Sequence, residues 1–163
     1  MDELRDDDLR NDDLRNIETL KYRYLRALDT KDWDTFTDTL TEDVVGNYGS
    51  APDGVPLRFT DRASLVGYLR TAMPAAVITE HRVGHPEITV TGDEATGRWY
   101  LQDRVILAEA NFMLIGAAFY ADTYRRTPDG WRICATGYER TYEATMSLQG
   151  LSFHLTPGPA LHG

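Results

Sequence analysis

Hydrophobic side chains recur at helical spacing in the first half of the chain. From residue 14 the apolar positions fall three or four residues apart, which predicts an amphipathic helix ending near Asp29. A second, short helix follows, with Thr30 or Asp32 as its N-cap. A third helix is predicted up to Pro74, because proline cannot continue a helix. We therefore expect three helices in this half.

The segment VVGNYGSAPDGVP, residues 44–56, separates the second and third helices. Its glycines and prolines are typical of turns and interrupt regular structure. The segment is therefore predicted to form one short strand and a turn-rich loop.

After Pro74 the hydrophobic period becomes two, which is the period of a β-strand. The turns TGDEA and TPDG separate extended stretches. The predicted strands are AVITEHRV, PEITVTG, TGRWYLQDRVIL, GAAFYADTYRR and WRICATGYERTYE. Three helices followed by a meander of long strands predict an α+β domain whose helices cover one face of a curved, mainly antiparallel sheet.

The chain divides into three parts by composition. Residues 1–13 form an acidic arm. Its leucines are five residues apart and do not share a helix face, which predicts a frayed arm; the alternative is a helical extension that touches a neighbouring subunit. Residues 14–143 form the single α+β domain. Residues 144–163 form a tail, either uninformative, or a lid over a pocket, or a strap onto a neighbouring subunit.

Charge and composition exclude several classes of partner. The net charge is -9, and without a basic stripe the chain is repelled by nucleic acids and anionic membranes. No apolar run approaches the ~20 residues that span a bilayer, and the acidic N-terminus does not resemble a secretory signal. The single cysteine, Cys134, agrees with a reducing compartment. We expect a soluble cytoplasmic protein.

Three residues do not fit the local pattern. Asp103 falls on the apolar face of its strand, so it needs a partner such as Arg140, or it is a pocket acid. Asp29 lies at the negative end of the first helix dipole, where it either caps the next helix or serves a site. Tyr24 lies on the inward stripe, as a core residue or a catalytic one.

The histidines do not predict a metal site. His81 and His85 would be ~13 Å apart on an extended strand, too far to share a zinc ion unless the chain bends at Gly84. The sequence also contains no phosphate loop, no dinucleotide fingerprint and no nucleophile elbow. Neither a metal nor an organic cofactor is expected.

Five stretches in the same order resemble the SnoaL-like branch of the nuclear transport factor 2-like superfamily, between about residues 17 and 143. These are RYLRALDTKDWDTF, EHRVGHPEIT, GDEATGRWYL, FYADTYRR and GWRICATGYERTYE. Within the branch they look most similar to bile acid 7α-dehydratase, and more distantly to scytalone dehydratase. The resemblance implies a cone-shaped barrel, a strongly curved sheet around three helices enclosing an apolar pocket.

The resemblance also implies a set of site residues. The catalytic positions of the dehydratases match Tyr24, Asp29 and His81, with His81 as proton shuttle, Asp29 as its orienting partner and Tyr24 as donor to an enolate oxygen. Asp103 and Arg140 match further polar pocket positions. The candidates for substrate binding or the pocket framework are Asp103, Arg140, Tyr48, Trp99 and Tyr120.

The implied function is a cofactor-independent dehydratase for a small hydrophobic, polycyclic or steroid-like carbonyl compound. An isomerase, a polyketide-type cyclase and a non-catalytic ligand-binding module remain as alternatives on the same scaffold. The open sheet face is expected to support a homotrimer, with a dimer as the alternative.

Overall fold

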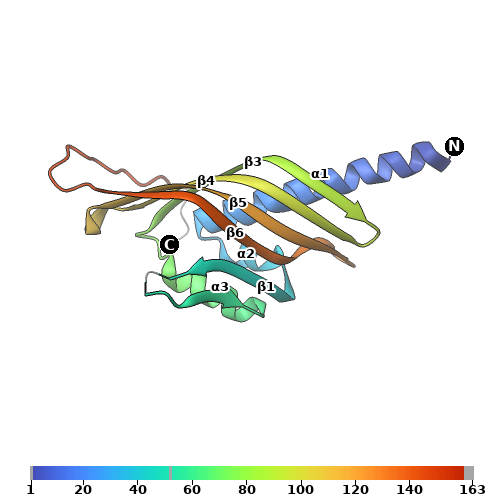
Figure 1. Ribbon diagram of the computed structural model, residues 1–163, viewed down its shortest axis with the longest axis horizontal. Coiled ribbons are helices and arrows are strands. Elements are labelled where there is room, and N and C mark those ends of the chain that lie inside the picture. The colour runs from blue at the N-terminus through green and yellow to red at the C-terminus, as the bar shows by residue number, and fades with distance from the viewer. Residues whose placement is uncertain (1, 52, 160–163) are drawn as a thin grey trace.

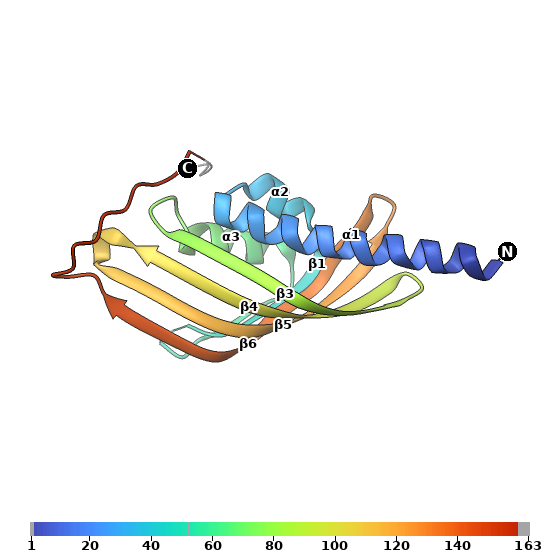
Figure 2. The ribbon, with the colours of Figure 1, turned by 90° about the horizontal axis from the view of Figure 1, so that it is seen from above.

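A computed structural model of the chain describes residues 2–51 and 53–159, with side chains from residue 10 onward in the first helix. Within this part of the chain, three α-helices lie on the concave side of one six-stranded sheet (Figures 1 and 2). The helices are α1 (Asp2–Thr30), α2 (Trp33–Asp38) and α3 (Arg62–Ala72). The strands are β1 (Leu40–Ser50), β2 (Pro56–Phe59), β3 (Ile78–Thr91), β4 (Glu94–Leu107), β5 (Phe112–Thr127) and β6 (Gly130–Ser147), with a short 3₁₀ helix, η1 (Ala108–Ala110).

The sheet is mixed and open. Its strand order is β2-β1-β6-β5-β4-β3, in which only the β1–β6 pair is parallel. The long strands β3 to β6 curve around α1 without closing into a complete barrel (Figure 2). This confirms the predicted α+β class and the mainly antiparallel curved sheet.

The region around residues 44–56 is more regular than the sequence predicts. β1 spans 11 residues, and Gly46 and Gly49 lie inside it. The strand forms despite its glycines because it pairs on both sides, with β2 and with β6, and a register shift between Asn47 and Ser50 accommodates Gly49 at φ +76°. The predicted strand and turn are both present, but the strand is longer than expected, and the turn joins it to β2 in a strand pair at one edge of the sheet.

Both predicted end segments differ in extent from the structure. α1 begins at Asp2, so residues 2–13 form the helical extension, one of the two predicted forms, and continue the first helix of the domain without a break. Contact of this extension with a neighbouring subunit stays a prediction. Asp13 ties this part of α1 to the sheet through Arg126 and the indole of Trp131. At the other end, β6 runs to Ser147 because it stays paired with β5, so the tail begins four residues later than residue 144. Residues 160–163 lie outside the described part.

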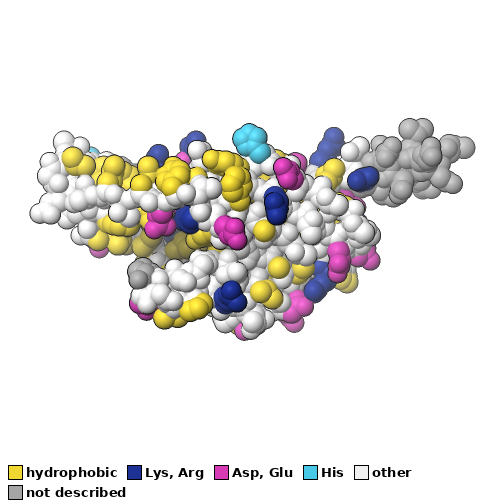
Figure 3. Space-filling view, viewed as in Figure 1, with side chains coloured by type: hydrophobic (Ala, Val, Ile, Leu, Met, Phe, Trp, Pro, Cys, Tyr) yellow, Lys and Arg dark blue, Asp and Glu magenta, His cyan; other side chains and the backbone are white. Residues whose placement is uncertain are grey.

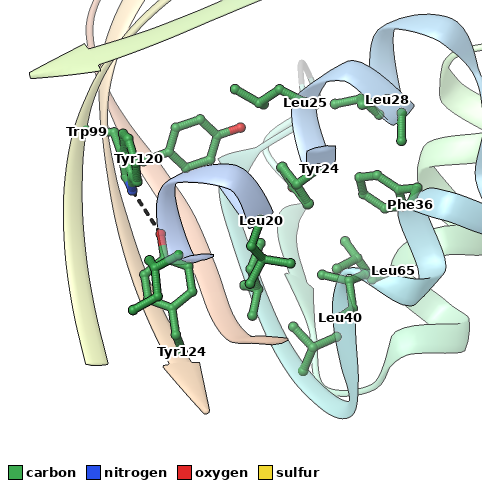
Figure 4. Close-up of a cluster of buried hydrophobic side chains, with 14 of the residues drawn as sticks. Leu20, Tyr24, Leu25, Leu28, Phe36, Leu40, Leu65, Trp99, Tyr120 and Tyr124 are labelled. Carbon is green, nitrogen blue, oxygen red and sulfur yellow. Dashed lines mark hydrogen bonds between the residues drawn. The ribbon is translucent and has the colours of Figure 1, made fainter. Parts of the chain in front are cut away.

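A continuous hydrophobic core fills the space between the helices and the concave face. Leucines of α1, Phe36 of α2 and Leu65 of α3 meet Trp99 and Tyr124 of the sheet (Figure 4). The indole N–H of Trp99 donates to the Tyr124 hydroxyl at 2.9 Å. Burial of these large side chains is the main force that holds the helices in the curve of the sheet.

One ion pair lies inside this core. Nζ of Lys21 is 2.8 Å from an oxygen of Asp122, and both side chains are completely buried. Asp122 also accepts hydrogen bonds from the hydroxyls of Tyr124 and Thr136, while the Lys21 ammonium lies over the ring of Tyr120. Burial lowers the pKa of Lys21, and the neighbouring Asp122 charge partly opposes this.

The outer, convex face of the sheet exposes several large apolar side chains. Tyr100 and Phe119 form an edge-to-face pair there, with ring centroids 5.1 Å apart. The others are Val45, Ile115, Tyr142 and Met146. Such a face agrees with the expectation of a homo-oligomer, which stays a prediction. No helix in the described part of the chain is long and apolar enough to cross a membrane.

The buried ion pair gives the first test. Asp122→Ala is expected to lower the free energy of unfolding by roughly 3–5 kcal/mol, because it leaves a buried ammonium and two hydroxyls without their acceptor. Lys21→Met should cost less, since Asp122 keeps two hydrogen-bond donors. Urea denaturation of both variants measures this order, and a larger loss in Lys21→Met would contradict it.

Candidate active site

Asp29 and His81 form the centre of the candidate site. Nδ1 of His81 is 2.6 Å from Oδ1 of Asp29, and the backbone N–H of His81 donates to Oδ2 at 2.8 Å. Because a carboxylate only accepts, Nδ1 carries the proton, and Nε2 is the ring nitrogen with a free lone pair. Nε2 has no hydrogen-bond partner among the described residues. The structure therefore brings together two residues that the sequence separates by 52 positions.

The end of α1 delivers Asp29 to β3. The helix stops at Thr30, and Lys31 adopts a left-handed conformation with φ +63°, which reverses the chain before α2. Asp32, not Asp29, caps α2 by accepting from the backbone N–H of Thr35 at 3.1 Å. This resolves the two interpretations of Asp29: its carboxylate is available for β3.

A second ion pair lies directly beside His81. Asp103 is the register partner of His81 across β3 and β4, so both side chains are on the concave face. Arg140 of β6 holds Asp103 with two hydrogen bonds, one of them Nη2 to Oδ2 at 2.7 Å. The predicted Asp103–Arg140 pair is confirmed. The side chain of Asp103 is 3% exposed and that of Arg140 is 25% exposed, so the arginine forms the solvent side of the pair.

Two tyrosines form a buried phenol pair deeper in the cone. The hydroxyls of Tyr24 and Tyr48 are 2.6 Å apart. Among the described residues the Tyr24 hydroxyl contacts Tyr48 rather than Asp29 or His81. Burial raises the pKa of both phenols well above its ordinary value, so both keep their protons at neutral pH and act as hydrogen-bond donors.

The two phenols differ in access. Tyr24 is completely buried, whereas Tyr48 is 9% exposed and packs against the ring of Tyr138, which in turn lies under the Arg140 guanidinium. Tyr48 is thus linked by ring contacts to the Asp103–Arg140 pair. The other two predicted pocket residues, Trp99 and Tyr120, are buried core residues with 0% and 2% exposure.

An apolar surface extends from His81 along the concave face. Beyond the His81–Asp103 row, Val105 pairs with Leu114 and Leu107 pairs with Phe112, and all four point inward by alternation. These four side chains are only partly buried, because the far ends of β4 to β6 extend beyond the helices (Figure 2). Figure 3 shows a recess with hydrophobic side chains between these strand ends and the β1–β2 lobe. The site is therefore open on its apolar side.

Hollows also occur on the outer face of the sheet. A small one of about 220 Å³ is bordered by Glu80, Arg82 and Asp103. A groove of about 630 Å³ on the outer face is bordered by His85 and by the aromatic pair Tyr100 and Phe119. A register shift between Gly84 and Glu87 accompanies the positive φ of His85, so His81 and His85 reach different faces of the sheet. No group of three or more metal-ligating side chains occurs in residues 2–51 and 53–159.

Sequence reasoning missed three residues of the site. Thr79 donates to Oδ1 of Asp29 at 2.8 Å, and Nζ of Lys31 donates to Thr79 at 3.1 Å. Gly116 lies opposite Asp103, where a Cβ would come within 2.6 Å of Arg140 Nη1 and 2.8 Å of Asp103 Oδ1. Only Gly116 carried a signal in the sequence, because a glycine inside a strand often marks a close approach.

Comparison with known proteins identifies the family. The sequence profile of the SnoaL-like domain matches residues 10–136, which include α1 from residue 10 onward, most of the sheet and both Asp29 and His81. The chain belongs to the SnoaL-like domain family. The predicted closeness to bile acid 7α-dehydratase is not supported by these comparisons and stays a prediction.

Solved structures confirm the SnoaL-like fold. A candidate scytalone dehydratase from Novosphingobium aromaticivorans superposes with a TM-score of 0.74 at 19% identity, covering 91% of this chain and 93% of the other. A nuclear transport factor 2-like protein from the same organism gives 0.70 at 22% identity, with 93% and 92% covered. The type 3 hexachlorocyclohexane dehydrochlorinase of Novosphingobium barchaimii gives 0.74 at 15% identity, with 91% and 97% covered.

Gly116 provides a test of the site geometry. Gly116→Ala is expected to lower the free energy of unfolding by roughly 1–3 kcal/mol, because the added methyl group displaces the Asp103–Arg140 pair. The matched control is Gly67→Ala on the exposed side of α3, where a Cβ meets nothing within 4 Å. Alanine there should be neutral or stabilising by up to about 1 kcal/mol. Equal denaturation midpoints for the two variants would contradict the close approach.

Proposed function

We propose that this SnoaL-like protein is a cofactor-independent carbon–oxygen lyase that removes water from a small hydrophobic carbonyl compound with a polycyclic or steroid-like body. The observation that carries the proposal is the Asp29–His81 pair, in which Asp29 accepts from both Nδ1 and the backbone N–H of His81. That double contact fixes the ring and its tautomer and leaves Nε2 as a base on the concave face.

In the proposed reaction, His81 Nε2 removes a proton from the carbon next to the carbonyl group. The C–H electron pair forms an enolate, whose collapse forms the C=C bond and breaks the C–O bond of the leaving hydroxyl group. The imidazolium then returns the proton to that oxygen, and water leaves. Asp29 stabilises the imidazolium between the two steps, as a carboxylate partner does for a histidine base.

The enolate oxygen needs a hydrogen-bond donor. The sequence resemblance gives this role to Tyr24, but Tyr24 is sealed in the core and its hydroxyl faces Tyr48. We therefore assign the direct donor role to Tyr48, the more exposed phenol, with Tyr24 holding its hydroxyl in place. A preorganised donor of this kind contributes on the order of 3 kcal/mol to transition-state stabilisation.

The charges around His81 favour an uncharged substrate. Asp103 and Arg140 neutralise each other, and the Nε of Arg140 also lies 3.5 Å from Glu143. The cations of this region, Arg140 and Lys31, are thus already engaged. A neutral carbonyl compound would lie on the apolar surface of Val105, Leu107, Phe112 and Leu114 with its polar end toward His81.

The structural neighbours support the class of reaction and not the substrate. Two of them carry the names of a dehydratase and a dehydrochlorinase, and both names describe eliminations. At under 25% identity they establish the fold alone. Isomerase chemistry starts with the same proton removal, so it is the alternative that the experiments must separate.

The first experiment tests the base. Wild type and variants are incubated in D₂O with two sets of polycyclic ketones, one with and one without a β-hydroxyl group. Exchange of the α-proton is followed by NMR and water loss by enone absorbance. His81→Gln is expected to lower both rates by roughly 10²–10⁴-fold, because the general base is lost.

His85→Gln is the matched control, since His85 borders the outer groove and lies four residues along the same strand. It should retain rates within about twofold of wild type, as expected for a surface substitution away from the site. Exchange and double-bond migration without water loss would favour the isomerase. Binding of the ketones without any exchange would leave a ligand-binding module and refute the enzyme.

A second experiment separates the two phenols. Tyr48→Phe is expected to lower kcat by roughly 10²-fold with little change in KM, because the donor acts mainly on the developing enolate. Tyr24→Phe should have a smaller effect, since Tyr48 keeps its own hydroxyl. A larger loss in Tyr24→Phe would return the donor role to Tyr24.

A further inference from the structure

Lys31 is a buried cation close to the dyad that the proposed reaction does not use. It is 3% exposed, and the left-handed turn after α1 brings it back toward β3. Its Nζ donates to the Thr79 hydroxyl at 3.1 Å. Burial lowers the pKa of Lys31, while the charge of Asp29 opposes this effect. A lysine is rarely buried unless a partner compensates its lost hydration.

Thr79 connects this cation to Asp29. Its hydroxyl accepts from Lys31 and donates to Oδ1 of Asp29 at 2.8 Å. Oδ1 is the same oxygen that accepts from Nδ1 of His81. Asp29 therefore accepts three hydrogen bonds, two from His81 and one from Thr79, and the lysine charge lies only two hydrogen bonds from the carboxylate.

We propose that Lys31 and Thr79 are positioning residues of the Asp29–His81 pair, which lock the carboxylate in place and oppose the uptake of a second proton by His81. Thr79 and Nδ1 of His81 share Oδ1, and the additional donor helps to hold the carboxylate in the orientation that faces the ring. The positive charge of Lys31 disfavours an imidazolium nearby, which keeps the neutral, basic form of His81 available.

Other charged groups face His81 and must be counted. Asp103 lies opposite it on β4, and Arg140 and Glu143 of β6 belong to the same cluster. Asp103 favours an imidazolium, but its ion pair with Arg140 reduces that effect. On the other side of β3, the outward-facing Glu80 and Arg82 form an ion pair of their own. On the concave side, Lys21 and Arg140 each form an ion pair with a carboxylate. Among the described residues, Nζ of Lys31 instead donates to the hydroxyl of Thr79.

The test is an NMR titration of the His81 ring, assigned with His81→Gln. In Lys31→Met the titration midpoint is expected to move upward by roughly one pH unit, the size that a unit charge two hydrogen bonds away produces in a partly screened site. Thr79→Val should move it in the same direction by a smaller amount. This titration needs no substrate, so its result does not depend on the proposed reaction. Only the catalytic meaning of the inference rests on the proposed function.

Arg82→Met is the matched control. It removes the same charge one residue from His81, but on the outward side of β3, where the Arg82 side chain is 77% exposed. Solvent screening should limit its shift to about 0.2 unit. Lys31→Arg, which keeps the charge, and Thr79→Ser, which keeps the hydroxyl, should restore the wild-type midpoint.

The outcomes decide the inference in either direction. A shift in Lys31→Met no larger than that of Arg82→Met overturns the role of Lys31. An unchanged midpoint in Thr79→Val overturns the role of Thr79. If Lys31→Met or Thr79→Val does not fold, as judged by circular dichroism, Lys31→Gln and Thr79→Ala replace them. Each removes the charge or the hydroxyl in question, and each must shift the midpoint upward; an unchanged midpoint overturns the role of that residue.

Discussion

The contact between Asp29 and His81 joins the two layers of this protein at their most polar point. One carboxylate at the end of α1 accepts from the backbone and the side chain of the same residue on β3. Asp29 is the last residue but one of α1, so its carboxylate lies at the helix end beside β3, and the left-handed turn at Lys31 brings the next side chain back to Thr79. The contact also orients the imidazole so that its free nitrogen lies on the concave face. The geometry of the candidate site follows from where this helix stops.

Two carboxylate ion pairs lie on the concave side of the sheet, at different depths. Lys21 and Asp122 lie fully inside the core. Asp103 and Arg140 lie nearer the opening, with the arginine outermost. Pairing of this kind is expected, since a lone charge in an apolar environment is very unfavourable. With these charges engaged, Nε2 of His81 remains without a hydrogen-bond partner among the described residues, beside an apolar surface that the helices do not cover.

Some residues of the site follow from local periodicity, and others only from family resemblance. Alternation alone placed Asp103 on an apolar face and suggested Arg140 as its partner, which the structure confirms. Family resemblance was needed to connect Asp29 with His81, because nothing local in either segment points to the other. The same resemblance placed Tyr24 in the pocket, whereas the structure buries it behind Tyr48. The full length of β1 was missed, and the sequence left the segment before residue 14 open between a frayed arm and a helical extension. Both elements are stabilised by contacts with distant segments, through β6 and through Arg126.

By itself, the sequence determined the three helices, the strand meander and the inward face of each long strand, because a helix or strand repeats its buried positions along a continuous stretch of chain. The tertiary structure alone decided that β1 runs parallel to β6, that Thr79 and Lys31 support Asp29, and that Gly116 makes room for an ion pair. These features depend on the curvature of the sheet and on the register between segments many residues apart. Local periodicity carries no information about either.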